Sequence, residues 1–171
     1  MPQQLTGTSQ VAEAKRASES ATEMVQVVLP NDANPLGFIL GGTVMHLIDI
    51  AGAIACHRHT RSLLVTAAVD GLQFLHPIKV GDLIILKACV TAAWTTSLEV
   101  EVEVFSEETL TGLRRMTSVS YLTFVAIDRD GRRLPIPGLI LETAEEKRKA
   151  AEADKRRAAR LEARKALEAR G

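Results

Sequence analysis

A single carboxylate stands within the most apolar stretch of the chain. Asp49 lies in the segment GGTVMHLIDIAGAIA (41–55), where nearly all of its neighbours are apolar. This composition predicts a buried helix, on which the polar residues Thr43, His46 and Asp49 recur at steps of three and share one narrow stripe. An aspartate sheltered from water could act as a general base or attack a carbonyl directly, and the sequence leaves both roles open. By spacing alone, a structural aspartate that faces solvent also remains open.

The residues just before this helix could supply the other parts of an acyl-transfer site. Asn34 lies in the turn NDANPLG (31–37), and its amide group could orient a water molecule. Gly41 and Gly42 begin the helix, where N–H groups lack a partner within the helix and the missing Cβ lets a carbonyl oxygen come close. One such donor stabilises a developing oxyanion by about 3–4 kcal/mol. The structural alternatives are a turn-forming asparagine and an ordinary helix-start turn.

The other reactive side chains form no pattern typical of a metal site. Cys56, His57 and His59 are one or two residues apart and have no acidic residue beside them, so we expect no metal. Cys56 and Cys89 form no CxxC motif. We interpret both as reduced thiols of a cytoplasmic protein, with one intramolecular disulfide as the open alternative.

Length and composition restrict the class of protein. The chain has 171 residues, of which 46% are hydrophobic and 25% charged, and its formal net charge is zero. We expect one globular domain without a net field that would attract nucleic acid or an anionic membrane. No apolar run reaches the roughly 18 residues that span a bilayer. Residues 1–22 are polar, lack an apolar secretory leader and are expected to form a loosely ordered tail.

After the apolar helix the pattern changes to that of strands. We expect strands at residues 24–29, 65–75, 83–92, 97–105 and 116–127, joined by turns rich in Gly, Pro, Asn or Asp. In the strand at 97–105, Leu and Val alternate with Glu99, Glu101 and Glu103, which predicts one buried face and one wet face. The short connections favour antiparallel neighbours.

These elements predict an α+β fold in which a five-stranded antiparallel sheet wraps around the long central helix. We divide the chain into a tail at 1–22, a domain at 23–141 and a charged C-terminal helix at 142–171. The last segment has few large apolar residues, so we expect a surface helix stabilised by i,i+4 pairs such as Glu145–Lys149. The sheet covers only one side of the central helix, and a second subunit is expected to cover the other side.

Five motifs, in order along the chain, resemble the hotdog-fold acyl-CoA thioesterases, in particular the cytosolic long-chain acyl-CoA hydrolases and their single-domain bacterial relatives. They are NDANPLG…GGT…LIDIAG (31–52), TAAVDGLQFLHPIKVGDL (66–83), TSLEVEVEV (96–104), LTGLRRMT (110–117) and YLTFVAID (121–128). The resemblance implies the hotdog fold and hydrolysis of fatty acyl-CoA to free fatty acid and coenzyme A. It implies no cofactor apart from the coenzyme A of the substrate.

The resemblance also implies roles for the residues named above. Asp49 would be the catalytic carboxylate, Asn34 the second catalytic residue, and Gly41 and Gly42 the site of the thioester carbonyl. In that family the aspartate and the asparagine come from opposite protomers of a hotdog dimer, and dimers often assemble further. A homodimer, built into a homohexamer as a trimer of dimers, is therefore expected.

Coenzyme A carries phosphates, so basic and hydroxyl side chains are candidates to bind it. These candidates are Arg58, Lys87, Thr96, Ser97, Arg114 and Arg115. Two departures from the family pattern lie near the expected site. Leu40 stands where relatives commonly have His, and Trp94 and Thr95 stand where they often have Gly-Arg, which removes a polar group and a cation.

The main alternative is a non-catalytic, acyl-CoA-binding hotdog regulator of transcription. Such a sensor would carry a helix-turn-helix before the hotdog domain, and the 22-residue leader is too short and polar for one. Nucleic acid is not an expected partner, because the 10 Lys/Arg of residues 142–171 alternate with 7 Asp/Glu. A sensor also needs no acid at Asp49. A hotdog dehydratase would need a His with a Glu that the central helix does not offer in that family's pattern.

Overall fold

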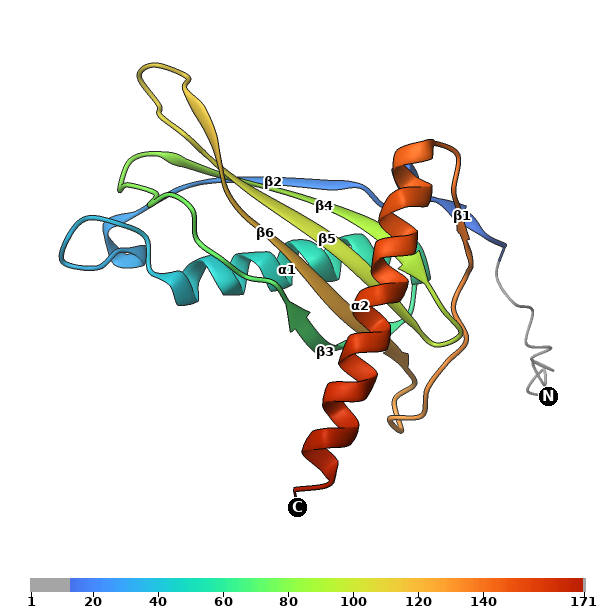
Figure 1. Ribbon diagram of the computed structural model, residues 1–171. Coiled ribbons are helices and arrows are strands. Elements are labelled where there is room, and N and C mark those ends of the chain that lie inside the picture. Colours follow the sequence, from blue (N-terminus) through green and yellow to red (C-terminus); the bar gives the residue numbers. More distant parts are fainter. Residues whose placement is uncertain (1–12, 171) are drawn as a thin grey trace, which may run out of the picture.

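The computed structural model describes residues 13–170. Its centre is a five-stranded antiparallel sheet in the order β2-β4-β5-β6-β3 (Figure 1), so β2 and β3 form the two edges. The strands are β2 (Thr22–Val27), β3 (Leu63–Asp70), β4 (Leu83–Ala93), β5 (Ser97–Glu107) and β6 (Arg114–Ile127). The predicted α+β class and the sheet of five strands are confirmed.

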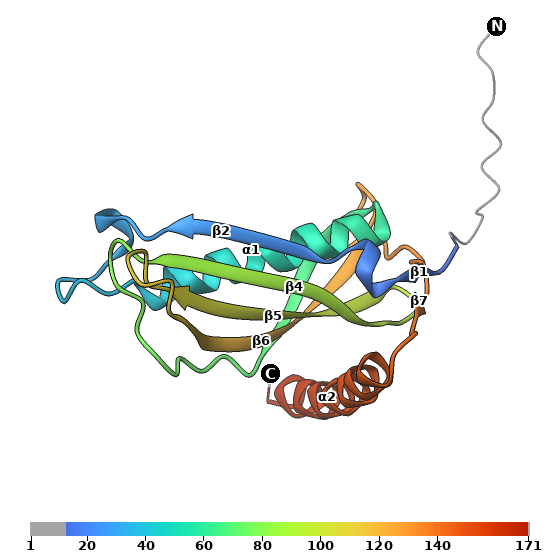
Figure 2. The same ribbon diagram turned by 90° about the horizontal axis from the view of Figure 1, so that it is seen from above.

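Helix α1 (Gly41–Thr60) packs along one face of this sheet, as Figure 2 shows. Its buried apolar residues include Val44, Leu47, Ile48, Ala51 and Ala55. Gly52 permits a close approach, because a Cβ there would lie 3.1 Å from Cγ1 of Val100 and 3.3 Å from Cε2 of Phe124. The predicted apolar helix beginning at Gly41 is confirmed. The helix ends at Thr60, and the C-cap residue Arg61 adopts the left-handed conformation with a φ of 53°.

The C-terminal helix α2 (Ala144–Glu168) lies across the opposite face of the sheet (Figure 2). Thr143 caps its first turn: Oγ1 accepts the N–H of Glu146 at 3.1 Å, and the Glu146 carboxylate accepts the N–H of Thr143 at 3.0 Å. Arg148 forms exposed pairs with Glu145 and Glu152 at 2.5 and 2.6 Å. Pairs of the predicted kind are therefore present, although Lys149 does not bind Glu145.

The face of β5 that was predicted to be wet lies beneath α2. Glu99 is 0% exposed and Glu101 only 7% exposed, whereas Glu103 is partly exposed. Arg156 of α2 donates to Glu99 at 2.7 Å, and Lys149 donates to Glu101 at 2.5 Å. The wet-face prediction was wrong at Glu99 and Glu101, because alternation marks a face as polar without showing whether water or a basic helix covers it.

Two boundaries differ from the sequence prediction. Strand β3 ends at Asp70 and not near residue 75, because Gly71 adopts a φ of 66° and the chain leaves the sheet. Part of the predicted tail is ordered: β1 (Lys15–Arg16) pairs in parallel with β7 (Leu139–Ile140), and Ala17 is buried. The prediction for residues 1–12 lies outside the described residues.

A 3-10 turn, η1 (Ala17–Glu19), leads into β2, and a second, η2 (Pro30–Asp32), precedes the turn that contains Asn34. Neither helix of residues 13–170 offers a stretch apolar and long enough to cross a lipid bilayer.

Candidate active site

Asp49 lies on the middle of α1 and is partly buried. Its Oδ1 accepts a hydrogen bond of 2.7 Å from Oγ1 of Thr66, which belongs to the edge strand β3. The bond joins a carboxylate and a hydroxyl 17 residues apart, and it fixes the orientation of the carboxylate. The other oxygen, Oδ2, accepts no hydrogen bond from the described residues. The arrangement suits a carboxylate that takes up a proton or attacks a carbonyl at a fixed angle.

Sequence reasoning did not select Thr66. It lies inside a strand pattern of mostly apolar residues, and only the packing of β3 beside α1 brings it to Asp49. A threonine among apolar strand residues was the only available signal, and threonine is itself a favoured strand residue.

Asn34 organises the turn that precedes α1. Its Oδ1 accepts the N–H groups of Leu36 at 2.9 Å and Phe38 at 3.2 Å, and its own N–H donates to the Phe38 carbonyl at 2.8 Å. The turn-forming role proposed as the structural alternative is therefore present. The amide NH₂ group is not used by these bonds, so it stays available to a water molecule or a substrate oxygen.

A cavity of about 340 Å³ adjoins this turn. Asn34 and Gly41 contribute to its wall together with apolar side chains. The apolar residues of the wall are Phe38, Ile39, Val44, Phe74, Leu75, Pro77 and Ile78. The cavity thus combines a polar end at the start of α1 with an apolar lining that could hold a hydrocarbon chain.

The N-terminus of α1 offers free backbone donors at the polar end of this cavity. The first helical hydrogen bond runs from Val44 N to Leu40 O at 3.1 Å, so Gly41, Gly42 and Thr43 have N–H groups without an acceptor in the helix. Leu40, at the N-cap, has no side-chain oxygen that could cap them. These N–H groups and the positive end of the helix dipole favour an oxyanion here.

Within one chain, Asp49 and Asn34 do not share this cavity. Asn34 and Gly41 line it, whereas Asp49 is absent from its wall and contacts β3. Some apolar residues of α1 and β3, the two elements that carry Asp49 and Thr66, are exposed in the single chain: Met45 on α1 is 48% exposed, and Val65 and Val69 on β3 are 45% and 48% exposed. An uncovered edge strand with apolar side chains indicates a surface that another chain covers.

The other nucleophilic and metal-binding side chains are poorly suited to the chemistry. Cys56 is fully buried on α1, and burial raises the pKa of its thiol above the usual range, which disfavours the thiolate. His59 is buried, and its Nε2 contacts the carbonyl oxygen of Pro137 at 3.0 Å. Over residues 13–170, histidine, cysteine, aspartate and glutamate form no cluster of three that could hold a metal ion.

The structure distributes the predicted CoA-binding residues over several surfaces. Arg58 donates to the Ala21 carbonyl and to Thr22, and Lys87 lies 3.8 Å from Glu23 and over the Phe105 ring. These basic side chains already have partners within the chain.

The remaining candidates divide between the two ends of the sheet. Arg114 pairs with Glu107 at 2.7 Å and begins β6 with its neighbour Arg115, whereas Thr96 lies in the turn between β4 and β5 and Ser97 begins β5. Thr96 and Ser97 line a second cavity together with arginines of α2, which were not among the candidates.

Comparison with known proteins identifies the family. A family model described as Thioesterase superfamily matches residues 36–113. A Bacillus subtilis protein named as an uncharacterized acyl-CoA thioester hydrolase is 39% identical over 134 residues, which cover 78% of each chain. The chain therefore belongs to the thioesterase superfamily, among proteins named acyl-CoA thioester hydrolases.

Solved structures give the same result at the level of the fold. An apo-hexameric acyl-CoA thioesterase superposes with a TM-score of 0.84 at 38% identity, covering 88% of this chain and 97% of its own. A Staphylococcus aureus acyl-CoA hydrolase, solved with butyryl coenzyme A, coenzyme A and coenzyme A disulfide, has a TM-score of 0.81 at 35% identity, covering 91% and 97%. The predicted hotdog fold is confirmed.

Three further structures of the Staphylococcus aureus protein each carry a single substitution by alanine: of an aspartate in one, of a threonine in another and of an asparagine in the third. Each is 34% identical to this chain, with TM-scores of 0.80 to 0.82. The alignments cover 91% or 92% of this chain and 96–99% of the other chain. In that protein the asparagine precedes the aspartate by 15 residues and the threonine follows it by 17. The same residue types stand at the same spacings here, at Asn34, Asp49 and Thr66.

Proposed function

We propose that this protein hydrolyses acyl-CoA thioesters to a free fatty acid and coenzyme A, with Asp49 as the general base or nucleophile. The observation that carries the proposal is the hydrogen bond from Thr66 to Asp49, which orients a carboxylate beside an uncovered strand edge. The matching spacings in the Staphylococcus aureus acyl-CoA hydrolase support the same three residues.

The proposed reaction balances with water as the only co-substrate. In the base mechanism, Asp49 takes a proton from a water held by the Asn34 amide, and the water oxygen bonds to the thioester carbon. The carbonyl oxygen becomes negative and is stabilised by the N–H groups of Gly41 and Gly42. The C–S bond then breaks, and the thiolate of coenzyme A leaves and is protonated. In the nucleophilic variant Asp49 attacks first, and water hydrolyses the resulting anhydride.

The apolar cavity beside Asn34 fits the hydrocarbon part of such a substrate. A thioester carbonyl at the N–H of Gly41 would point its acyl chain along Phe38, Phe74 and Ile78. No metal or bound cofactor takes part in the proposed steps, since the carboxylate, the amide and the helix N–H groups supply the base, the positioning and the oxyanion donors.

The working unit that we propose is a homodimer joined along the edge strand β3, repeated as a trimer of dimers in a homohexamer. Pairing along β3 would cover Val65 and Val69 and would bring each Asp49–Thr66 pair to the interface. It would let Asp49 of one protomer face Asn34 of its partner, which are separate within one chain. We place the protein in the cytoplasm, where its two free thiols, Cys56 and Cys89, would stay reduced.

The test is to incubate the protein with a series of acyl-CoA substrates of increasing chain length and to measure hydrolysis as the release of the CoA thiol. The native protein should release it, whereas Asp49→Asn, which retains an acceptor for Thr66 but removes the charge, should reduce kcat by about a thousandfold or more. The assembly of the variant, measured by light scattering, should be that of the native protein. Native-like hydrolysis by Asp49→Asn would exclude the proposed role of Asp49.

A further inference from the structure

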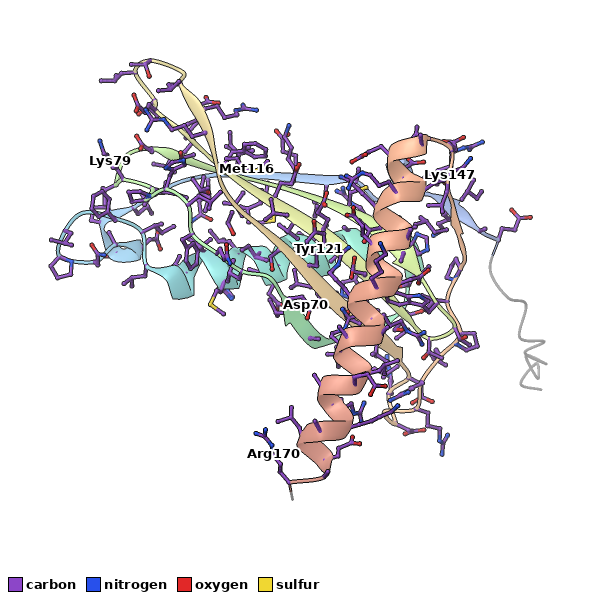
Figure 3. The ribbon with its side chains drawn as sticks, in the orientation of Figure 1. Asp70, Lys79, Met116, Tyr121, Lys147 and Arg170 are labelled. Atoms are coloured by element: carbon purple, nitrogen blue, oxygen red, sulfur yellow. The ribbon has the colours of Figure 1, made fainter. Side chains whose placement is uncertain are left out.

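The last turns of α2 project past the edge of the sheet. Figure 1 shows the helix continuing beyond β3, and Figure 3 shows Asp70 beside the middle of α2 and Arg170 beyond its end. Every residue from Leu161 to Arg170 is exposed, whereas Ala153 on the earlier turns is fully buried. The earlier turns are therefore held on the sheet of this chain, and residues 161–168, which we call the overhang, extend beyond it.

The contacts of α2 show the direction in which the helix crosses the strands. Arg156 binds Glu99 on β5, and its guanidinium lies 3.6 Å from the centre of the Tyr121 ring on β6. Arg160, one turn later, binds Asp70 at the end of β3. The helix thus passes from β5 over β6 to β3, the edge of the sheet. The overhang adds about 12 Å of helix, which corresponds to roughly two further strand positions at about 4.8 Å each.

The overhang carries apolar side chains on the side of the helix that faces the sheet. Leu161 and Leu167 line the second cavity, of about 420 Å³, together with residues of β3 and β6, so neither leucine points to the outer side of α2. They are nevertheless 46% and 64% exposed. The strands of this chain therefore leave both leucines largely uncovered, and such a surface suits an apolar partner.

A matching uncovered surface lies at the start of β3. Leu63 and Val65, which we call the β3 strip, are 53% and 45% exposed. Val65 is paired with Val125 of β6, which lines the cavity beneath α2, so the strip points to the α2 side of the sheet. However, α2 crosses the other end of this strand at Asp70, about 23 Å of strand away from Leu63. The helix of the same chain therefore does not cover the strip.

Pairing of two β3 edges about a two-fold axis would bring these surfaces together. A two-fold axis perpendicular to the sheet makes the two strands antiparallel, so the end of one β3 lies beside the start of the other. The overhang leaves its own sheet at the end of β3, where the next strand position belongs to the first residues of the partner's β3. Because such an interface is isologous, each dimer would contain the contact twice.

We propose that the overhang of α2 docks on the partner subunit's β3, with Leu161 and Leu167 packed on the partner's β3 strip. The occupant is a second copy of this chain, because the overhang and the strip are continuous with the edge along which the proposed dimer pairs. This inference rests on that proposed dimer, and it adds a helical contact to the pairing of the two strands.

The contact would also support the proposed active site. Val65 directly precedes Thr66, whose hydroxyl donates to Asp49. The overhang of one protomer would thus hold in place the strand that orients the carboxylate of the other protomer.

The assembly tests the apolar contact. Leu161→Gln/Leu167→Gln removes both leucines and keeps good helix formers. Each dimer would lose four buried leucines, so we expect the dissociation constant of the two protomers in sedimentation equilibrium to rise about a hundredfold or more. Ala158→Gln/Ala166→Gln, at two exposed positions of α2 outside the cavity wall, is the matched control and should assemble like the native protein.

Two outcomes of this measurement would overturn the proposal. One is a leucine variant that assembles like the native protein. The other is a hexamer that separates into stable dimers and no further, because the overhang would then join dimers to one another and would not cross the seam between two β3 strands.

Cross-linking tests the geometry. In Leu63→Cys/Leu167→Cys, the two thiols lie toward opposite ends of β3 within one chain but close together across the proposed seam. A short bifunctional thiol reagent should therefore give a covalent dimer on a denaturing gel. The two single variants control for the native thiols of Cys56 and Cys89. If the double variant gives no more covalent dimer than the single variants, the overhang does not lie on the partner's β3.

Both measurements need no substrate, so their failure is distinct from failure of the proposed function. Covalent dimers from the double variant, with no acyl-CoA hydrolysis by the native protein, would retain the overhang contact and refute the hydrolase. Native hydrolysis, with no cross-link and an unchanged assembly of the leucine variant, would retain the hydrolase and refute the overhang contact.

Discussion

Thr66 of the edge strand β3 donates a 2.7 Å hydrogen bond to Asp49 in the middle of α1. The bond places a charged acceptor between the helix and the one edge of the sheet that would be covered by a second chain. A carboxylate in that position loses part of its hydration without being sealed in the core. Its orientation is then set by one hydroxyl, which makes that hydroxyl a positioning group for the proposed reaction.

Thr66→Val keeps the size and branching of the side chain and removes the hydroxyl. A hydrogen bond to a charged group contributes about 1.5–3 kcal/mol, so we expect kcat to fall about tenfold to a hundredfold. Thr66→Ser is the matched control, because it keeps the hydroxyl and should retain most of the activity. Steady-state kinetics of both variants provide the measurement, and equal rates for Val and Ser would show that the hydroxyl has no role.

Asn34→Asp separates the two possible roles of Asn34. An aspartate keeps an acceptor for the N–H groups of Leu36 and Phe38, so the turn should persist, but it loses the NH₂ donor. We expect a large loss of kcat with little change in the urea midpoint. Asn34→Ala should lower both, because it also removes the turn hydrogen bonds. Full activity of Asn34→Asp would leave Asn34 with the turn-forming role alone.

The sequence predicted those parts of the molecule that local patterns specify. Apolar residues on nearly every side of 41–55 specified a covered helix, and alternation specified the core strands. Thr66 was missed because its partner is 17 residues away and the contact arises only from packing. The burial of Glu99 beneath α2 was missed for the same reason, because its partner Arg156 lies 57 residues further along the chain.

A charge on the uncovered edge strand should prevent the proposed dimer. Val65 is 45% exposed on β3, and a lysine there would have to be buried without a partner when two edges pair. We expect the native protein to form an even-numbered assembly in sedimentation equilibrium and Val65→Lys to shift it toward the monomer, with loss of activity. Leu110→Lys, at a position 99% exposed on the turn between β5 and β6, should change neither. A native monomer would contradict the proposed interface.

His59 should make stability depend on pH. Burial lowers the pKa of His59, although its contact with the Pro137 carbonyl partly opposes this effect. The unfolded residue takes up a proton near its usual pKa of about 6.5, so below that pH the unfolded state binds more protons and the free energy of unfolding decreases. Urea unfolding at pH 7.5 and 5.5 should show this loss, and His59→Gln should reduce it.

The attachment of α2 depends on Glu99, the buried acid that Arg156 and Thr91 bind at 2.7 and 2.8 Å. Arg156→Ala leaves this carboxylate beneath the helix without its main partner, and loss of one member of a buried pair costs about 3–5 kcal/mol. Because Arg156 is itself 21% exposed and water can enter in its place, we expect a value at or below the lower end of that range.

Arg148→Ala is the matched control for this prediction. It removes an arginine from the same helix whose pairs with Glu145 and Glu152 are exposed, and water screens such pairs so that they contribute little to stability. Urea unfolding of both variants gives the comparison. A double variant, Glu99→Met with Arg156→Met, removes both charges and should recover much of the stability lost in Arg156→Ala, because the desolvation cost of Glu99 disappears with its charge. If Arg156→Ala is no more destabilising than Arg148→Ala, the ion pair does not hold α2 on the sheet.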